Sequence, residues 1–322
     1  MRVDSLVMND YEIKDIGDRR ILIIENKEYE TNYSQKVIEL IIRRKGLARA
    51  PQYFKYKKER ARFFSCLFRY LDKEGLNNLK VLEVGCSTGH LTEFLNEQPC
   101  FREIYTYDTD KLFVEITRLK IEELGLGKVK RSDCFSTSET RDLPYEDNFF
   151  DLIIVSATLE HLPYEDRYLY VDEYYRKLRI GGLICFFDTP NRNFLLETHS
   201  TGLPFINRLP PQAAFIYAKL FARLKGIDFS EFVRPNTAWR NATYYECLPH
   251  AITIDVKDIS EEAGYGYSFF VKDKKGLKFK FFLQPYFSAL KFLSDKIGFP
   301  VSFFLPCLNL VFKKVHNYEK EI

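Results

Sequence analysis

Short apolar runs alternate with helical patterns between residues 80 and 190, and this alternation limits the possible folds more than any other feature of the chain. A helical stripe over 111–124 follows Asp110, a good N-cap, and another over 165–178 ends before Gly181. Nearly all-apolar strands that alternate with helices are typical of a parallel sheet covered on both faces. We therefore predict a doubly wound α/β core. The predicted strands span residues 80–84, 103–107, 128–131, 151–156 and 183–187.

The segments outside this core follow other patterns. Apolar residues recur at helical spacing over 34–46 and 55–72, and five prolines lie between residues 189 and 248, around one predicted helix at 212–224. Strand-like runs at 251–256, 267–272 and 303–313 and a helix over 280–296 follow. We predict four segments: an N-terminal helical extension (1–77), a ligand-binding core (78–190), an insertion or lid that forms an acceptor pocket (191–250), and C-terminal strands that complete the sheet (251–322).

The net charge bears on whether the protein binds nucleic acid, and the cysteines bear on its cellular compartment. The chain of 322 residues has 48 basic and 45 acidic residues, and a net charge of +3 does not indicate a nucleic-acid partner. A basic stretch over 43–62 keeps RNA binding open as an alternative. None of the seven cysteines forms a CxxC pair or a Cys/His cluster at zinc spacing, which favours free thiols in a reducing cytoplasm.

Membrane insertion and secretion are not expected. The first fifteen residues contain acids where a signal peptide needs an unbroken apolar stretch. The most apolar run, 297–312, contains Pro300 and Pro306 and is shorter than the roughly 20 residues of a membrane helix. We therefore expect a cytoplasmic protein with at most peripheral membrane contact, and the sequence leaves its oligomeric state open.

The loop after the first core strand, Gly-Cys-Ser-Thr-Gly at 85–89, indicates what the core binds. A dinucleotide fingerprint would have glycine at Ser87 and His90, and the carboxylate of Glu83 would repel a pyrophosphate. No Gly-Lys-Ser/Thr sequence forms a phosphate-binding P-loop. The loop instead suits a cationic ligand with an amino-acid end, because Gly85 and Gly89 allow close backbone approach and Glu83 can hold an amine.

Two further carboxylates complete the predicted binding site. Asp108 follows Gly85 by 23 residues, where a doubly wound fold places the acid that accepts hydrogen bonds from ribose hydroxyls. Asp133 ends the third strand, where it can accept from the N6 amine of adenine. Together these groups describe S-adenosylmethionine. The predicted cofactor-binding residues are Glu83, Gly85, Cys86, Ser87, Gly89, Asp108, Thr109, Asp133, Cys134 and Ser156.

With these motifs, the sequence resembles the class I S-adenosylmethionine-dependent methyltransferases that carry an LEHL motif. The resemblance rests on the segment 83–89, on Asp108 and Asp133, on the run LPYEDNFFDLII at 143–154, and on Leu-Glu-His-Leu at 159–162. It implies a seven-stranded sheet of order 3-2-1-4-5-7-6, in which strand 7 is antiparallel and is formed by residues 303–314. Ser87 departs from the family, which has glycine at the middle of this loop.

Methyl transfer to a hydroxyl also needs a base, and histidine is the usual residue near pH 7. His161 follows the fourth strand and His199 follows the fifth, so either is a candidate catalytic base. Quinone-precursor methyltransferases hold a divalent metal with a second glutamate before a similar LEH segment. Ala157 occupies that position here, so we predict no metal.

The expected acceptor is a hydroxyl of a small molecule, a glycan or a lipid-linked compound. Aromatic residues make up 16% of the chain, and those between 190 and 296 favour an apolar or ring-shaped acceptor. Two alternatives stay open at this point: an RNA methyltransferase that uses the basic stretch, and a module that binds S-adenosylmethionine without turnover.

Overall fold

The structure, a computed structural model, describes residues 11–17, 19–54, 56–197, 199–222, 228–234, 238–251, 253–267, 269, 277–297 and 300–317. The chain divides into two compact units, each made of two stretches of sequence. The first contains residues 1–65 and 85–135, and the second contains residues 66–84 and 136–322.

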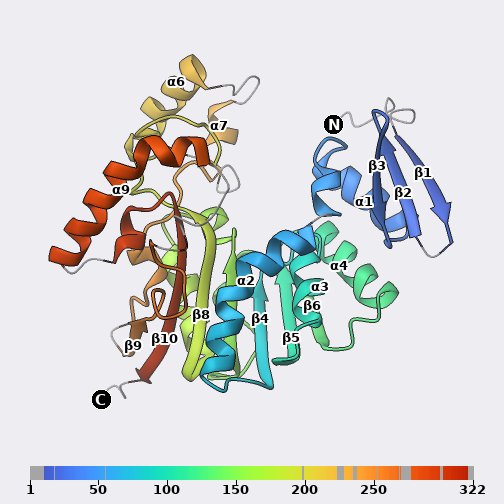
Figure 1. Cartoon of the computed structure of the whole chain (residues 1–322), viewed down its shortest axis with the longest axis horizontal. Helices are drawn as coiled ribbons and strands as arrows, with labels where there is room; N and C mark the ends of the chain where they lie inside the picture. The colour runs from blue at the N-terminus through green and yellow to red at the C-terminus, as the bar shows by residue number, and fades with distance from the viewer. Residues whose placement is uncertain are drawn as a thin grey trace. The chain divides into compact units, whose positions relative to one another are not determined.

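A seven-stranded sheet has the order β6-β5-β4-β7-β8-β10-β9 (Figure 1). In chain order this is 3-2-1-4-5-7-6, and the predicted topology is confirmed. β10 pairs antiparallel with β8 and β9, so the C-terminal apolar run is the antiparallel strand 7. The strands are β4 (Leu79–Val84), β5 (Phe101–Asp108), β6 (Val129–Cys134), β7 (Phe150–Ser156), β8 (Leu178–Pro190), β9 (Ile254–Asp258) and β10 (Cys307–Asn317).

Burial explains why the strands β7 and β8 contain long apolar runs. Residues 152–155 of β7 are fully buried, as are residues 184–187 of β8, because helices cover both faces of a doubly wound sheet. The connecting helices are α3 (His90–Asn96), α4 (Lys111–Glu123) and α5 (Arg167–Lys177). Asp110 caps α4 as predicted: its side chain accepts hydrogen bonds from the N–H groups of Leu112 and Phe113.

The N-terminal extension is only partly helical, so the prediction for residues 1–77 needs correction. The helices α1 (Gln35–Lys45) and α2 (Tyr56–Lys73) are present, but β1 (Tyr11–Ile16), β2 (Arg19–Ile24) and β3 (Lys27–Thr31) form an antiparallel sheet before them. These strands are rich in charged residues because one face is exposed to solvent. Left-handed backbone at Glu25 and Asn26, with φ of 47° and 62°, makes the tight turn between β2 and β3.

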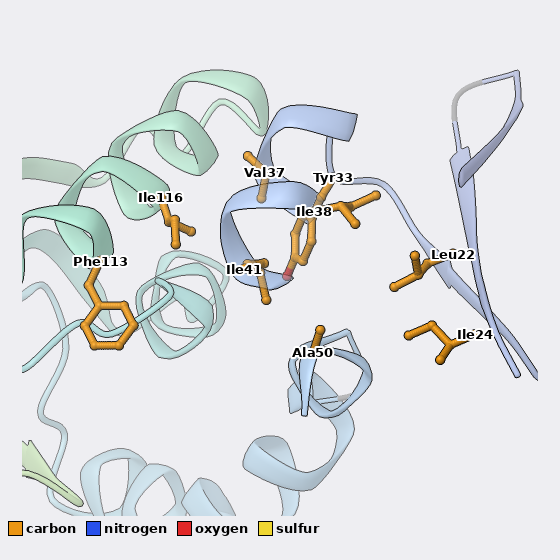
Figure 2. Packing of buried hydrophobic residues seen from close by; sticks show 9 residues of the cluster. All are labelled: Leu22, Ile24, Tyr33, Val37, Ile38, Ile41, Ala50, Phe113 and Ile116. Atoms are coloured by element: carbon orange, nitrogen blue, oxygen red, sulfur yellow. The ribbon is translucent and has the colours of Figure 1, made fainter. Parts of the chain in front are cut away.

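This N-terminal sheet is packed into the first unit by one hydrophobic cluster (Figure 2). The cluster joins Leu22 and Ile24 of β2 to residues 37, 38 and 41 of α1 and to Phe113 and Ile116 of α4. Residues 11–50 therefore share a core with the helix that follows β5.

The second unit contains the insertion and the C-terminal helix. α6 (Pro211–Phe221) and α9 (Leu277–Ile297) correspond to the helices predicted at 212–224 and 280–296, whereas the short helix α7 (Phe229–Phe232) was not predicted. The strand expected at 267–272 is not seen at Tyr267 and Phe269, which are helical, and the rest of that run lies outside the described residues. Within the described part of the chain, every helix is too short or too polar to span a bilayer.

Candidate functional site

The glycine loop after β4 adopts the tight path that a closely bound ligand requires. Gly85, Ser87 and Gly89 all have positive φ, at 80°, 49° and 73°. The N–H groups of Gly85 and Cys86 donate to the carbonyl of Tyr107 at 3.0 and 2.9 Å. A side chain at position 89 would lie 2.9 Å from a Thr117 atom, so this glycine is needed for packing as well as for conformation.

Asp108 lies at the end of β5 beside this loop, as the sequence predicts. Its carboxylate accepts hydrogen bonds from the backbone N–H of Ser87 at 2.8 Å and of Asp110 at 3.0 Å. Burial raises the pKa of Asp108, and these two N–H donors oppose the rise. The carboxylate keeps lone pairs for further donors, which is what two ribose hydroxyls would need.

The other predicted cofactor residues of the first unit are close to Asp108, either in the sequence or in the register of the paired strands β5 and β6. Cys134 ends β6 and is paired in register with Asp108, and Asp133 precedes it with an ion pair to Arg131 at 3.0 Å. Thr109 directly follows Asp108. Cys86 is 2% exposed and accepts a hydrogen bond from the Thr117 hydroxyl, so it can meet a ligand only through its backbone.

In the second unit, a single hydroxyl links the ends of β4 and β7. Glu83 is 1% exposed on β4, and Ser156 is the last residue of β7. The hydroxyl of Thr158 donates to the carbonyls of Val84 and Ser156 at 3.1 and 3.0 Å. Ala157 between them has φ of 48°, and this left-handed residue turns the chain into the LEHL segment.

The two candidate bases lie beside each other although they are far apart in the sequence. His161 ends the short 3-10 turn η3 (Leu159–His161), and His199 lies in the loop after β8. Their ring centroids are 5.4 Å apart with an interplanar angle of 70°. Burial lowers the pKa of His199, and the negative charge of Glu197 opposes this.

Glu197 organises the loop that contains His199. It is fully buried, and its carboxylate accepts from the N–H groups of His199, Ser200 and Thr201 at 2.6, 2.9 and 2.5 Å. A bridge between Leu196 and Pro204 closes the loop. Glu197 therefore sets the position of the His199 backbone.

Arg167 and Glu246 were not anticipated from the sequence. Arg167 is 2% exposed and donates to the carbonyls of Glu160 and Leu162 at 3.3 and 3.4 Å, and to Glu246 at 3.2 Å. Glu246 also accepts from Arg192 at 3.1 Å. These contacts join the LEHL turn to the insertion, and no motif marks them in the sequence.

One group of side chains has the composition of a metal site. Atoms of Glu160, His161 and His199 that could act as ligands all lie within 4.8 Å of one another. Glu160 is 2% exposed, and neither of its carboxylate oxygens accepts a hydrogen bond from the residues that the structure describes. Burial raises the pKa of Glu160 to about 8, and the charge of Asp188 adds to the rise.

Three comparisons with known proteins found similar methyltransferases. A family model described as a methyltransferase domain matches residues 82–186. The chain is 29% identical to a ubiquinone biosynthesis O-methyltransferase of Azoarcus over 161 residues, which cover 50% of this chain and 64% of that protein. It is 26% identical to a demethylmenaquinone methyltransferase of Staphylococcus aureus over 148 residues, which cover 46% of this chain and 56% of that protein. The match thus spans less than two thirds of either relative.

Similar solved structures include the YcgJ protein from Bacillus subtilis, with a TM-score of 0.39, 16% identity, and coverage of 79% of this chain and 99% of that one. A second is an S-adenosylmethionine-dependent methyltransferase from Clostridium acetobutylicum, with a TM-score of 0.36, 22% identity, and coverage of 42% and 53%. From the family match, the strand order and the glycine loop with Asp108, residues 82–186 form a class I S-adenosylmethionine-dependent methyltransferase domain whose cofactor is S-adenosylmethionine.

Proposed function

We propose that this protein transfers a methyl group from S-adenosylmethionine to a hydroxyl of a small-molecule, glycan or lipid-linked acceptor. The observation that carries the proposal is the approach of His161 and His199, whose ring centroids are 5.4 Å apart. Both follow the carboxyl ends of parallel strands, where ligands bind in open α/β sheets. Each is exposed, so an acceptor can reach it.

Each predicted cofactor residue has a distinct role in this proposal. The backbone of the loop from Gly85 to Gly89 lies against the amino-acid end of the cofactor, and Glu83 holds its amine. Asp108 accepts from the two ribose hydroxyls, and Asp133 accepts from the adenine amine. Cys86, Thr109, Cys134 and Ser156 each lie at or just after the end of a strand, and we propose that they contribute backbone groups or small side chains.

The reaction is an in-line displacement at the methyl carbon. The acceptor oxygen forms a bond to that carbon while the carbon–sulfur bond breaks, and S-adenosylhomocysteine leaves. The hydroxyl proton passes to the His161–His199 pair. The sulfonium is already activated, so the main task of the protein is alignment, and orientation alone can contribute roughly 7–11 kcal/mol.

Apolar side chains around the His199 loop support a ring-shaped or lipid-linked acceptor. Phe194 stacks on Phe287 with centroids 6.3 Å apart, and Leu195 and Phe205 are 47% and 53% exposed at the two ends of the loop. The names of the two relatives, which concern ubiquinone and menaquinone, favour the same acceptor class. We propose a cytoplasmic location, which the seven free cysteines support.

Isothermal titration with S-adenosylhomocysteine tests cofactor binding. We expect Asp108→Ala to weaken binding at least about tenfold, since the variant loses hydrogen bonds to the ribose and to Ser87. Asp142→Ala is the matched control, because that carboxylate is 86% exposed, pairs with Arg176 and is not among the predicted cofactor residues. Undiminished affinity in Asp108→Ala would contradict the cofactor assignment.

Methyl release from labelled cofactor, measured with a panel of phenolic, sugar and lipid-linked hydroxyl compounds, tests the reaction. We expect turnover to fall at least about a hundredfold in His161→Ala, within the range for loss of a general base. S-adenosylhomocysteine affinity should not change in that variant. Binding without turnover across the panel would instead favour a module that binds the cofactor and does not catalyse.

A further inference from the structure

Glu160 is an unusual residue for the interior of a protein. It lies in η3 and is 2% exposed, and among the described residues none donates a hydrogen bond to its two carboxylate oxygens. Burying a carboxylate without partners costs several kcal/mol, so such a group is normally neutralised by a proton or matched by a cation.

Two imidazoles converge on this carboxylate. The potential ligand atoms of Glu160, His161 and His199 are all within 4.8 Å of one another. The two histidines come from different segments, η3 and the loop after β8, so their meeting is a product of the fold and not of sequence proximity. Two nitrogen atoms and one carboxylate oxygen thus lie close enough together to bind one ion after small side-chain movements.

We propose that Glu160, His161 and His199 bind a divalent transition-metal ion. Imidazole nitrogens combined with one carboxylate suit Zn²⁺, Mn²⁺, Fe²⁺ or Co²⁺, whereas Ca²⁺ and Mg²⁺ prefer sets made of oxygen. Two histidines and one glutamate are a known zinc set, and they leave a coordination position for another oxygen. Metal–ligand bonds of about 2.0–2.2 Å require the three atoms to draw together, which the exposed histidine rings can do by side-chain rotation.

The backbone on both sides of the site is held in place. The carboxylate of Glu197 binds the N–H groups of His199 and its two successors, which fixes that loop. Arg167 donates to the carbonyls of Glu160 and Leu162 and so fixes the LEHL turn. Such supporting contacts orient ligands and lower the cost of ordering them when the ion binds.

In the sequence, only the LEH segment bears on the prediction of no metal. Ala157 removes a possible second carboxylate there, but the structure supplies a third ligand, His199, from another loop.

Ion binding as such does not depend on methyl transfer, whereas a catalytic use of the ion rests on the proposed function. In that use, an ion held by Glu160, His161 and His199 would lower the pKa of an acceptor hydroxyl, and the two histidines would act as ligands and not as the base.

Titration of the full-length chain with Co²⁺, after stripping with EDTA and dialysis, tests the proposal. Visible absorption reports coordination by nitrogen and oxygen ligands, and calorimetry with Zn²⁺ gives the stoichiometry. We expect one ion per chain at this site. Glu160→Gln, His161→Ala and His199→Ala should each weaken binding by at least about tenfold. His250→Ala is the matched control, because that histidine is not in the group and should leave the titration unchanged.

The absence of a cobalt spectrum, or equal affinity in wild type and His199→Ala, would overturn the proposal. His199 lies on an exposed loop, so this variant carries the test even if Glu160→Gln fails to fold. S-adenosylhomocysteine titration of the same samples separates the two hypotheses. Cofactor binding without ion binding overturns only the metal site, and ion binding without cofactor binding overturns only the proposed function.

Discussion

At the scale of single residues, the departure of Ser87 from the family loop gives the sharpest test. Ser87 has φ of 49°, a left-handed conformation that a β-branched residue adopts only at a cost. Its N–H also donates to Asp108, so the loop path and the ribose ligand are coupled. We expect Ser87→Val to destabilise the protein by about 1–3 kcal/mol and to weaken S-adenosylhomocysteine binding at least about tenfold.

Ser87→Gly is the control for this effect, since glycine adopts the same backbone conformation without strain. Its urea midpoint and its calorimetric affinity should remain close to those of the wild type. Equal behaviour of the valine and glycine variants would show that backbone conformation at position 87 does not control cofactor binding.

Some residues of the site could be predicted from the sequence and others could not. Asp108 is predictable because its distance from Gly85 reflects one strand–helix–strand unit, and its carboxylate does bind the N–H of Ser87. The burial of Glu160 and its proximity to His199 are not predictable. They depend on a loop path that the carboxylate of Glu197 determines, and no local pattern encodes that path.

At the scale of elements, the loop between β8 and α6 should depend on Glu197. Glu197→Ala removes the acceptor of three backbone N–H groups, those of His199, Ser200 and Thr201. We expect these amides to exchange with solvent at least about tenfold faster, because each loses a charge-assisted hydrogen bond. Hydrogen exchange measured by mass spectrometry checks this, with peptides from β8 as the internal control.

Glu197→Gln keeps one carbonyl oxygen as an acceptor and should show an intermediate increase. If peptides covering 197–201 exchange equally in wild type and Glu197→Ala, the carboxylate does not order the loop. S-adenosylhomocysteine affinity should not change in either variant, which distinguishes a positioning residue from a cofactor ligand.

The elements themselves show where sequence patterns work. β7 and β8 are recognisable because they contain apolar runs that are buried on both faces, as residues 152–155 show, whereas β6 has the more polar sequence Val-Lys-Arg-Ser-Asp-Cys. All three N-terminal strands, β1, β2 and β3, were missed, and in β1 and β3 interspersed charged residues resemble an exposed loop. Their signals are a period of two in Tyr-Glu-Ile-Lys-Asp-Ile and the Glu25-Asn26 turn.

At the scale of the whole molecule, the strand order could be predicted because the core motifs resemble a family whose sheet has that order. The division of the chain into two compact units could not be predicted. Residues 11–50 are separated in sequence from residues 85–135, yet they belong to the same unit and share its hydrophobic cluster. A shared core of this kind arises from complementary shapes, such as Ile41 against α4, which leave no periodic signal in the sequence.

This shared core predicts that the N-terminal segment stabilises the cofactor-binding loop. Ile41 is fully buried in the cluster that contains Phe113 and Ile116 of α4 (Figure 2). Ile41→Ala should lower the free energy of unfolding by about 2–5 kcal/mol, from lost burial and the cavity left behind. S-adenosylhomocysteine at about 100 times its dissociation constant should restore roughly 2.7 kcal/mol, since it binds the folded state only.

Urea unfolding followed by circular dichroism, with and without ligand, measures the loss and the recovery of the free energy of unfolding. Glu39→Ala on the exposed face of α1 is the control. An unchanged midpoint in Ile41→Ala would mean that residues 11–50 do not contribute to the core of this unit.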